Sequence, residues 1–326
     1  MWEIGNARPV VLVLGGTGFI GRHVVSALLA RGCGVVVGSR HPHRHATTDP
    51  ATELREAHLE RLLQASQWHA LLHDCDGVVN CVGILRERGR ETYQRVHHLA
   101  PAALAAACED SGTRFIHVSA LGLAAPVRSG FLRSKQDGEA ALRASNADWH
   151  IVRPSLLDGE GGFGARWIRR VARWPIHPLP RGATGRLAVL DVGDLGIAIA
   201  ALAQHGAEER ELRLPDPVVR EHDLGGVRIH TLAEHLAAMR ALNTTTPARL
   251  IHIPDWLARA AAHVCDVLHW TPFSFGHWEL LRRDNVPLHN RLPVLLGRVP
   301  RGVGAAVPAH TPQTISDGVV EQARSA

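Results

Sequence analysis

The chain has 326 residues, of which 45% are hydrophobic, a composition that fits a globular protein with one large domain or two smaller ones. Its net charge of +5 favours an anionic ligand or surface, but no nucleic-acid-binding motif occurs, so no nucleic-acid partner is predicted. The five Cys form no CxxC pair and no Cys/His cluster, which predicts reduced thiols in the cytoplasm and no metal site. No apolar run reaches the roughly 18 residues of a membrane span.

Short apolar runs alternate with helix-like segments through the first half of the chain. Strands are predicted at 9–14, 33–40, 76–83, 114–121 and 149–155, with helices at 17–32, 99–112 and 134–145. The alternation predicts parallel strands with crossover helices, an α/β Rossmann-type doubly wound sheet. Residues 53–72 are expected to be mostly helical, and no strand is placed between residues 41 and 75.

The pattern changes after Pro154, where Gly/Pro-rich loops such as GEGGFGARW are interrupted by predicted helices at about 194–204, 231–242 and 255–269. We therefore expect a dinucleotide-binding domain over 1–155. A smaller, irregular C-terminal substrate or partner domain is expected over 156–300, with some segments returning to the main sheet. Residues 301–326 are small and polar, which predicts a flexible tail.

The stretch LVLGGTGFIGRH places three glycines between the first strand and the first helix. Gly15 permits the tight turn, Gly18 lets the backbone approach a pyrophosphate, and Gly21 lets the helix pack against the strand. The pyrophosphate would then accept hydrogen bonds at the helix N-terminus. With a strand before and a helix after, this loop predicts a dinucleotide site; the alternative is a purely structural turn.

The end of the second strand indicates which dinucleotide is bound. Sites for NAD(H) commonly end this strand with Asp or Glu, whereas VVVGSRHPHRH has no carboxylate before Asp49. Arg40 and Arg44, with Ser39, can instead pair with a 2′-phosphate. NADP(H) is therefore the preferred cofactor and NAD(H) the alternative, while an ordinary basic loop is the structural interpretation.

The motifs GGTGFIG, VVNCVGIL, HVSALGL, FLRSKQDGE, VRPSLLDGEGG, VLDVGDLG and LLRRDNVP occur in this order between about residues 9 and 300. Together they resemble the atypical, extended-like short-chain dehydrogenase/reductases, which are often labelled NAD-dependent epimerase/dehydratase-like. The resemblance is strongest to the branch that contains the nucleotide-binding accessory subunit of respiratory complex I and its bacterial relatives.

The resemblance implies a cofactor contact at each matching position. The pyrophosphate would lie beside the glycine loop, the adenosine ribose beside VVNCVGIL, and the nicotinamide end beside Lys135 and the VRPS segment. Besides the two arginines, the implied cofactor-binding residues are Gly15, Thr17, Gly18, Phe19, Ile20, Cys81, Val82, Gly83, Ser119, Lys135, Pro154 and Ser155. VLDVGDLG would pack the C-terminal part onto the sheet, or Asp194 would simply begin a helix.

Two departures from the family pattern bear on catalysis. Phe131 replaces the Tyr of the family's YxxxK pair, although Lys135, one helical turn later, is retained. A Tyr there would be acidified by the ammonium and could donate a proton, which Phe cannot. The Ser that polarises a substrate carbonyl falls at Leu121 in the best register, with Ser119 nearby. The usual reductase mechanism is disfavoured, and no catalytic residue is assigned.

Four other side chains are candidates for the missing proton donor, but each is better explained by structure. Tyr93, the only Tyr, is expected to pack at the start of a helix, and His117 to lie in the core. Ser129 and Ser134 lie close before Lys135 in the sequence, but a hydroxyl is too weak an acid to replace a phenol easily.

Residues 255–270 place apolar residues on one face of a helix, followed by Phe273, Phe275 and Trp278 in an expected loop. Most of this face is expected to pack on the domain itself. The alternative is contact with a protein partner or a membrane surface, which suits a basic segment that contains Trp.

Three functions remain. The preferred one is a protein that holds NADP(H) in a structural, assembly or sensing role linked to respiratory or quinone metabolism, which rests on the resemblance alone. The second is an active NADP(H)-dependent oxidoreductase with a non-standard proton donor, acting on a quinone or small carbonyl compound. A nucleotide-sugar epimerase or dehydratase would need the missing Tyr. The expected location is cytoplasmic, either free or peripheral at the inner face of the membrane.

Overall fold

The structure is a computed structural model that describes residues 8–42, 51–123, 126–212, 219–268 and 274–303. Seven parallel strands form the central sheet in the order β11-β6-β5-β4-β1-β2-β3. Their bounds are β1 Val10–Leu14, β2 Gly34–Ser39, β3 Thr52–Glu56, β4 Gly77–Asn80, β5 Arg114–Val118, β6 Trp149–Pro154 and β11 Glu221–Leu224. Five of these strands follow the predicted runs, and the predicted doubly wound α/β fold is confirmed.

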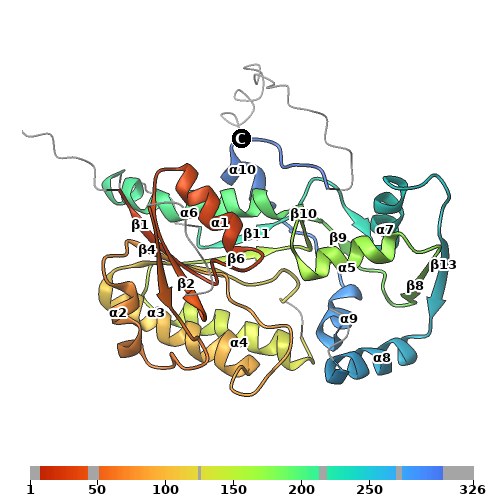
Figure 1. The fold of residues 1–326 in the computed structure, drawn as a ribbon, viewed down its shortest axis with the longest axis horizontal. Helices are drawn as coiled ribbons and strands as arrows, with labels where there is room; N and C mark the ends of the chain where they lie inside the picture. The colour runs from red at the N-terminus through yellow and green to blue at the C-terminus, as the bar shows by residue number, and fades with distance from the viewer. Residues whose placement is uncertain (1–7, 43–50, 124–125, 213–218, 269–273, 304–326) are drawn as a thin grey trace, which may run out of the picture.

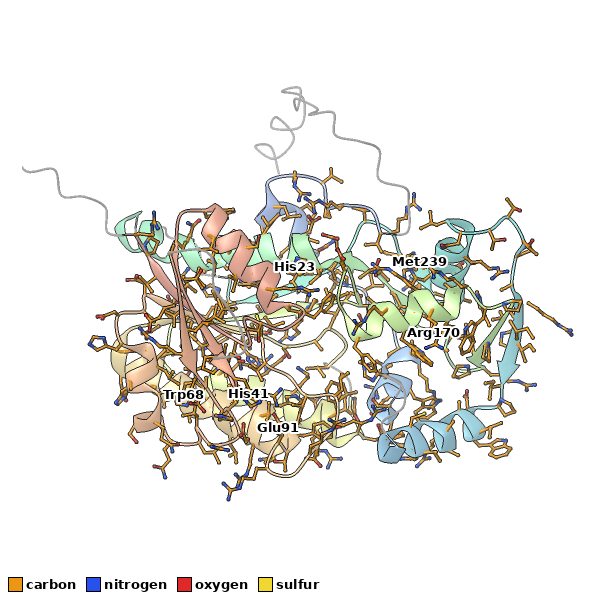
Figure 2. All side chains as sticks on the ribbon, in the orientation of Figure 1. His23, His41, Trp68, Glu91, Arg170 and Met239 are labelled. Atoms are coloured by element: carbon orange, nitrogen blue, oxygen red, sulfur yellow. The ribbon has the colours of Figure 1, made fainter. Side chains whose placement is uncertain are left out.

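Helices cover both faces of the sheet, as Figure 1 shows. One face carries α1 (Gly21–Ala30), α6 (Val192–Leu212) and α10 (Leu292–Leu296); the other carries α2 (His69–Leu72), α3 (Ala100–Ser111) and α4 (Gly130–Ala144). Each face has its own buried apolar cluster, and Trp68, labelled in Figure 2, is fully buried in the second. Because both faces are covered, the central strands are apolar runs without alternation.

The helix expected over 53–72 is wrong for most of its length. Residues Thr52–Glu56 form the edge strand β3, which pairs with β2, and only the short turns η2 (Ala65–Gln67) and α2 are helical. TELRE lacks the apolar pattern of a strand because neither face of this edge is fully buried. Pairing with β2 therefore decides its structure against its helix propensity.

The remaining elements lie to the right in Figure 1, apart from the π-helix η3 (Gln94–Leu99), which precedes α3. They are the helices α5 Phe163–Ala172, α7 Leu232–Ala241, α8 Asp255–Leu268 and α9 Phe275–Leu281, and the strand pairs β7 Leu157–Asp158 with β10 Leu190–Asp191, β8 Ile176–Pro180 with β13 Arg249–Ile253, and β9 Arg186–Leu187 with β12 His230–Thr231. The helices predicted after residue 190 are present as α6, α7 and α8.

Two loops predicted in this half are wrong in part. The stretch GEGGFGARW was expected to be a loop, but its last five residues form the start of α5. Gly162 is the N-cap, and apolar and Arg side chains follow it with helical spacing. Phe275 and Trp278 lie on α9, which Ser274 caps by accepting a hydrogen bond from the His277 N–H. Phe273 lies outside the described residues.

The apolar face of α8, which was expected to pack on the rest of the domain, is largely exposed at the positions whose side chains are described. Trp256 is 72% exposed, and Leu257 and Val264 are also exposed. The buried contacts of α8 come from the small residues Ala258 and Ala262, which let the helix lie close to α9. Trp256, Leu257 and Val264 therefore remain available on the surface.

The segment after α10 returns to the sheet layer. The buried carboxylate of Asp194, in the first turn of α6, accepts hydrogen bonds from the Arg298 guanidinium (2.6 Å) and the Arg301 N–H (2.6 Å). The Asp191 carboxylate accepts a hydrogen bond from the Asp194 N–H at the start of α6, and the Asp194 carboxylate fixes the C-terminal segment to this helix. Residues 304–326 of the predicted tail lie outside the described residues, and no helix in the described part is long and apolar enough to span a bilayer.

Candidate functional site

A cavity of about 1120 Å³ runs along the carboxyl-terminal edge of the sheet and continues into the C-terminal half of the molecule. It passes the ends of β1 and β4, between which the strand order reverses. Such a switch point is where open α/β sheets bind ligands. Pockets for small molecules usually measure about 300–1,000 Å³, so this cavity has room for more than one average ligand.

The predicted cofactor-binding residues gather at this cavity. Those that line it are Gly15, Thr17, Gly18, Phe19, Ile20, Arg40, Cys81, Val82, Gly83, Ser119, Lys135, Pro154 and Ser155. Arg44 lies outside the described residues. The sheet thus brings positions from five separate motifs to one cavity, and their contact with a dinucleotide stays a prediction.

The glycine loop has the shape that a pyrophosphate needs. Gly15 has a φ of 71°, in the left-handed region that favours glycine, and its N–H donates to the Gly38 carbonyl (2.9 Å). A Cβ added at Gly21 would lie 2.2 Å from the Gly15 carbonyl oxygen. The loop therefore depends on glycine at both positions, and its residues fit a nicotinamide dinucleotide.

At the end of the cleft where the adenosine is expected, the Arg40 side chain is already paired with a carboxylate. Its guanidinium forms an ion pair with Glu91, which lies at the same edge of the molecule as His41 in Figure 2. The Arg40 side chain is 56% exposed, and exposed ion pairs contribute only about 0–1 kcal/mol. A bound anion can therefore displace Glu91 at small cost.

Phe131, at the position of the family's Tyr, lies in a cluster of aromatic rings. Its ring centroid is 5.7 Å from Tyr93, 5.5 Å from His97 and 6.0 Å from His277, on which it stacks. Both Phe131 and His277 line the cavity. The acid's position is thus filled by a packed apolar ring, with an imidazole from α9 beside it.

Lys135 lies one helical turn after Phe131 on α4, with its ammonium 5.8 Å from the centroid of that ring. The residue is buried and also lines the cavity. Burial lowers the pKa of Lys135 to about 8, although the nearby carboxylate of Glu139 opposes this shift. Lys135 can therefore exchange a proton close to neutral pH.

His277 is a lining residue that the sequence analysis missed. Its Nδ1 lies 2.6 Å from the Ser274 hydroxyl, which fixes the ring at the start of α9. Burial lowers the pKa of His277 to about 4, so the imidazole is neutral at pH 7. It can offer one hydrogen bond to a polar ligand atom, but it is a poor source of protons.

The other candidate proton donors have structural roles, as predicted. The Tyr93 hydroxyl donates to the Leu85 carbonyl (2.8 Å), and burial raises its pKa to about 12. Burial also lowers the pKa of the core residue His117 to about 3. Ser129 caps α4 by accepting from the Leu132 N–H, and the Ser134 hydroxyl donates to the Phe131 carbonyl.

The expected nicotinamide end is held by backbone and hydroxyl contacts. The Ser155 hydroxyl donates to the Asn285 carbonyl (2.6 Å), and the Asn285 amide donates to the Leu121 carbonyl (2.8 Å). Ser119 and Leu121 both line the cavity, two residues apart. The LLRRDNVP motif therefore closes the cavity against the ends of β5 and β6.

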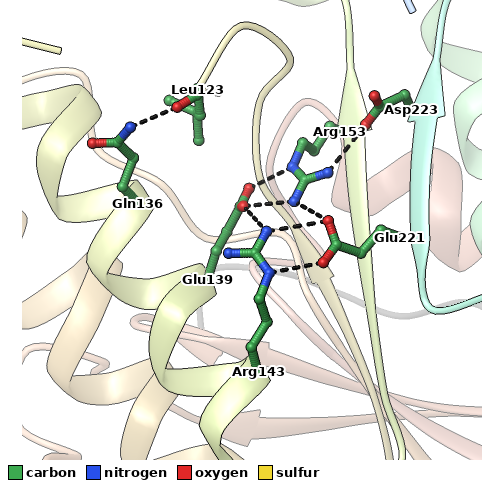
Figure 3. Close-up of polar contacts among 7 residues, drawn as sticks. All are labelled: Leu123, Gln136, Glu139, Arg143, Arg153, Glu221 and Asp223. Carbon is green, nitrogen blue, oxygen red and sulfur yellow. Dashed lines mark hydrogen bonds and ion pairs between the residues drawn. The ribbon is translucent and has the colours of Figure 1, made fainter. Parts of the chain in front are cut away.

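A charged network positions α4, and with it Lys135 (Figure 3). Glu139 accepts hydrogen bonds from Arg153 on β6 (2.7 and 2.8 Å) and from Arg143 on α4 (2.8 Å). Both arginines also contact Glu221 on the edge strand β11. Burial raises the pKa of Glu139, but Arg153 outweighs this effect and keeps the pKa below its usual value.

Beyond Lys135 the cavity becomes a chamber walled by α5, α8, α9 and the β8–β13 pair. We call this part the C-terminal chamber. Its lining consists of Phe163, Gly164, Ala165, Trp167, Ile168, Val171, Trp174, Pro178, Leu179, Pro180, Leu187, Leu232, Leu236, Ile253, Ala258, Ala261, Cys265, His277, Leu280, Leu281 and Asn285. Among the described residues, none of these side chains is formally charged at pH 7.

Comparison with known proteins places the chain in a family. A family model for NAD(P)H-binding proteins matches residues 15–171. The chain is 30% identical over 292 residues to the ceramide reductase of Caulobacter vibrioides, covering 86% of this chain and 87% of that protein. It is 26% identical to subunit 9 of the alpha subcomplex of mitochondrial NADH dehydrogenase from Arabidopsis thaliana, covering 85% and 68%.

The fold has relatives among solved structures. An NADPH-dependent quinone oxidoreductase of Escherichia coli, solved with NADPH, superposes with a TM-score of 0.65 at 16% identity, covering 90% of this chain and 96% of that one. By its similarity to the ceramide reductase and its match to the NAD(P)H-binding model, the chain belongs to the atypical short-chain dehydrogenase/reductases, a family of nicotinamide-dinucleotide-binding proteins.

Proposed function

We propose that the chain is an NADP(H)-dependent oxidoreductase that reduces a carbonyl or quinone group of a second ligand. The observation that carries this proposal is the continuity of the cavity, which runs from the glycine loop past Lys135 into the C-terminal chamber. A protein that only stored its cofactor would not need space for a second ligand beyond the nicotinamide end. Similarity to a ceramide reductase supports a reductase over a holding role.

Lys135 is the proposed proton donor in place of the missing phenol. The bound cofactor would supply a hydride, and the product oxygen would then need one proton. Lys135 lines the cavity, and its pKa of about 8 keeps it protonated at pH 7 while making it more acidic than an ordinary lysine. The neutral imidazole of His277 would donate a hydrogen bond that orients the carbonyl oxygen.

We also propose that NADPH is preferred over NADH. Arg40 would leave Glu91 and pair with the 2′-phosphate, assisted by Ser39. Glu91 works against this preference, because its carboxylate lines the same end of the cavity and repels a phosphate until Arg40 neutralises it.

The first test is cofactor binding by the purified full chain. Any bound nucleotide is identified, and the apo protein is then titrated with NADPH and NADH by energy transfer from Trp to the nicotinamide. Tighter binding of NADPH is expected. A clear preference for NADH would exclude the role of Arg40, and no binding of either would exclude the function altogether.

A structural, assembly or sensing role is the second candidate, and Phe131 is the observation that favours it. Similarity to a subunit of mitochondrial NADH dehydrogenase supports the same role. The variant Phe131→Tyr separates the two candidates. If only the variant oxidises NADPH with a panel of ketones and quinones, the native site is a holder; if the native protein is already active, Phe131 belongs to a working site.

The C-terminal half is the proposed contact with a membrane surface. The exposed apolar residues of α8 and of β13, which include Trp256, Leu250 and Ile251, lie among basic residues. Residues 163–181 hold five Arg and no acidic residue, and residues 249–265 hold two Arg and one Asp. Apolar side chains among arginines suit a bilayer that contains anionic lipid, which implies a peripheral location at the cytoplasmic face.

A further inference from the structure

We infer that the C-terminal chamber binds the hydrocarbon chain of a lipid substrate, with the reactive polar group of that lipid held between Lys135 and His277. This inference deepens the proposed oxidoreductase function and rests on it for the reaction, but the chamber and its chemistry are independent of turnover. The evidence consists of the composition of the lining, the distribution of charge along the cavity and the place where the chamber reaches the surface.

The lining of the chamber is mainly apolar. From α5 the chamber receives Trp167, Ile168 and Val171, which share one face of the helix, while the Arg side chains of α5 lie at the intervening positions. The buried side chains of Leu179 on β8 and Leu236 on α7 pack in one cluster with Ile168 and Val171 and continue this wall. An apolar ligand gains free energy here in proportion to the surface it buries, whatever its exact shape.

Charge divides the cavity into two parts. The charged side chains that line it are Arg40, Glu60, Glu91 and Lys135, all of which lie in the first 135 residues. Among the described residues after Lys135, the lining residues with a polar side chain other than the Trp rings are Ser155, Cys265, His277 and Asn285, and none of them is a cation. A nucleotide-sugar substrate would bring a diphosphate into this half without a cation to pair with it, which is costly in a buried site. An uncharged hydrocarbon chain meets no such penalty.

The chamber also has an opening suited to a lipid. Phe163 and Trp174 line it and are 47% and 39% exposed, so the apolar wall continues to the surface at both ends of α5. The exposed residues of β13 and α8, proposed above as a membrane contact, lie in the same half of the molecule (Figure 1). The proposed membrane contact and the chamber opening would therefore lie on the same half of the molecule, which suits the uptake of a hydrocarbon chain from a bilayer.

The test measures binding of a homologous series of straight-chain methyl ketones, from butanone upward, to the NADPH-loaded full-length protein by calorimetry. Affinity is expected to rise roughly three- to fourfold with each added CH₂ until the chamber is filled. The variant Ala261→Phe, which narrows the chamber from α8, should end this rise at a shorter chain. Ala260→Phe is the matched control, because Ala260 is exposed on the same helix and does not line the cavity.

Each outcome bears on the inference separately from the reaction. A rise in affinity that Ala261→Phe shortens and Ala260→Phe does not would support the chamber, even if no ketone is reduced, in which case only the oxidoreductase function fails. An affinity independent of chain length, or an equal effect of the two variants, would overturn it. Tighter binding of UDP-glucose than of any long-chain ketone would overturn it as well. NADPH titration of both variants verifies that each is folded.

Discussion

The two parts of the cavity differ in the chemistry of the residues that surround them: one is charged and the other is mainly apolar. At the nucleotide end, four charged side chains line the cavity, and behind this lining Arg153 pairs with the buried carboxylate of Glu139 and Arg298 with that of Asp194. In the C-terminal chamber, no formally charged side chain lines the cavity among the described residues. The first part has fixed hydrogen-bond partners and is suited to one polar ligand in one pose.

The second part has few directional contacts, so it suits ligands that share an apolar character and differ in length or shape. The boundary between the parts lies at Phe131, Lys135 and His277, where an apolar ring, a buried ammonium and a neutral imidazole meet. A hydride acceptor placed at this boundary would have its polar group on the charged side and its chain on the apolar side.

The largest effect is expected from Lys135→Met, which removes the charge from the boundary. If Lys135 donates the proton, reduction should slow by about 10²–10⁴. In the native protein the rate should fall as pH rises above about 8, because Lys135 then loses its proton. The variant should lose this dependence, which a stopped-flow pH profile measures. An unchanged profile in Lys135→Met would assign the proton to another group.

The next effect concerns the charged part. Glu139→Leu removes two hydrogen bonds from the Arg153 guanidinium but leaves its ion pairs with Glu221 and Asp223, so the free energy of unfolding should fall by about 1.5–3 kcal/mol. Arg143→Met is the control, because the Arg143 side chain is 40% exposed and its loss should lower the free energy of unfolding by only about 0–1 kcal/mol. Denaturant titration of both variants gives the two values. Equal losses would mean that the network does not set the position of α4.

Much of the charged part could be predicted from the sequence, because its signals are local. The glycine loop, the buried strands and the Phe131–Lys135 spacing each lie within a few residues. The edge strand β3 could not be predicted, because it forms by pairing with β2 and its sequence TELRE has no apolar alternation that would indicate a strand.

The chamber was harder to predict, for two different reasons. The helical alternation of apolar and Arg side chains in α5 is visible in FGARWIRRVARW, but the glycines before it favoured a loop. His277 carries no local signal, since only the packing of α9 against α4 brings it to Phe131. The pairing of Arg40 with Glu91, which are far apart in the sequence, is equally a property of the fold.

A smaller effect is expected at the adenosine end. Arg40→Gln should weaken NADPH about 10- to 100-fold by removing a charged hydrogen-bond donor, with little change for NADH. Glu91→Gln should act in the opposite direction, since it frees Arg40 from its ion pair. Fluorescence titration with both cofactors measures each change. If Arg40→Gln weakens NADH equally, Arg40 contacts a part of the cofactor other than the 2′-phosphate.

The smallest effect is expected for vesicle binding by the exposed face of α8, on the outer surface of the C-terminal half. Trp256→Ala should weaken co-sedimentation with phosphatidylcholine vesicles containing phosphatidylglycerol by a few-fold, because one exposed aromatic side chain no longer enters the interface. Thermal stability should not change, since Trp256 is 72% exposed. The control is Leu288→Ala, an exposed apolar residue outside α8 and β13. If both variants bind vesicles as the native protein does, the exposed face of α8 has another role; if Trp256→Ala alone binds less, the chamber opens toward the bilayer that would supply its ligand.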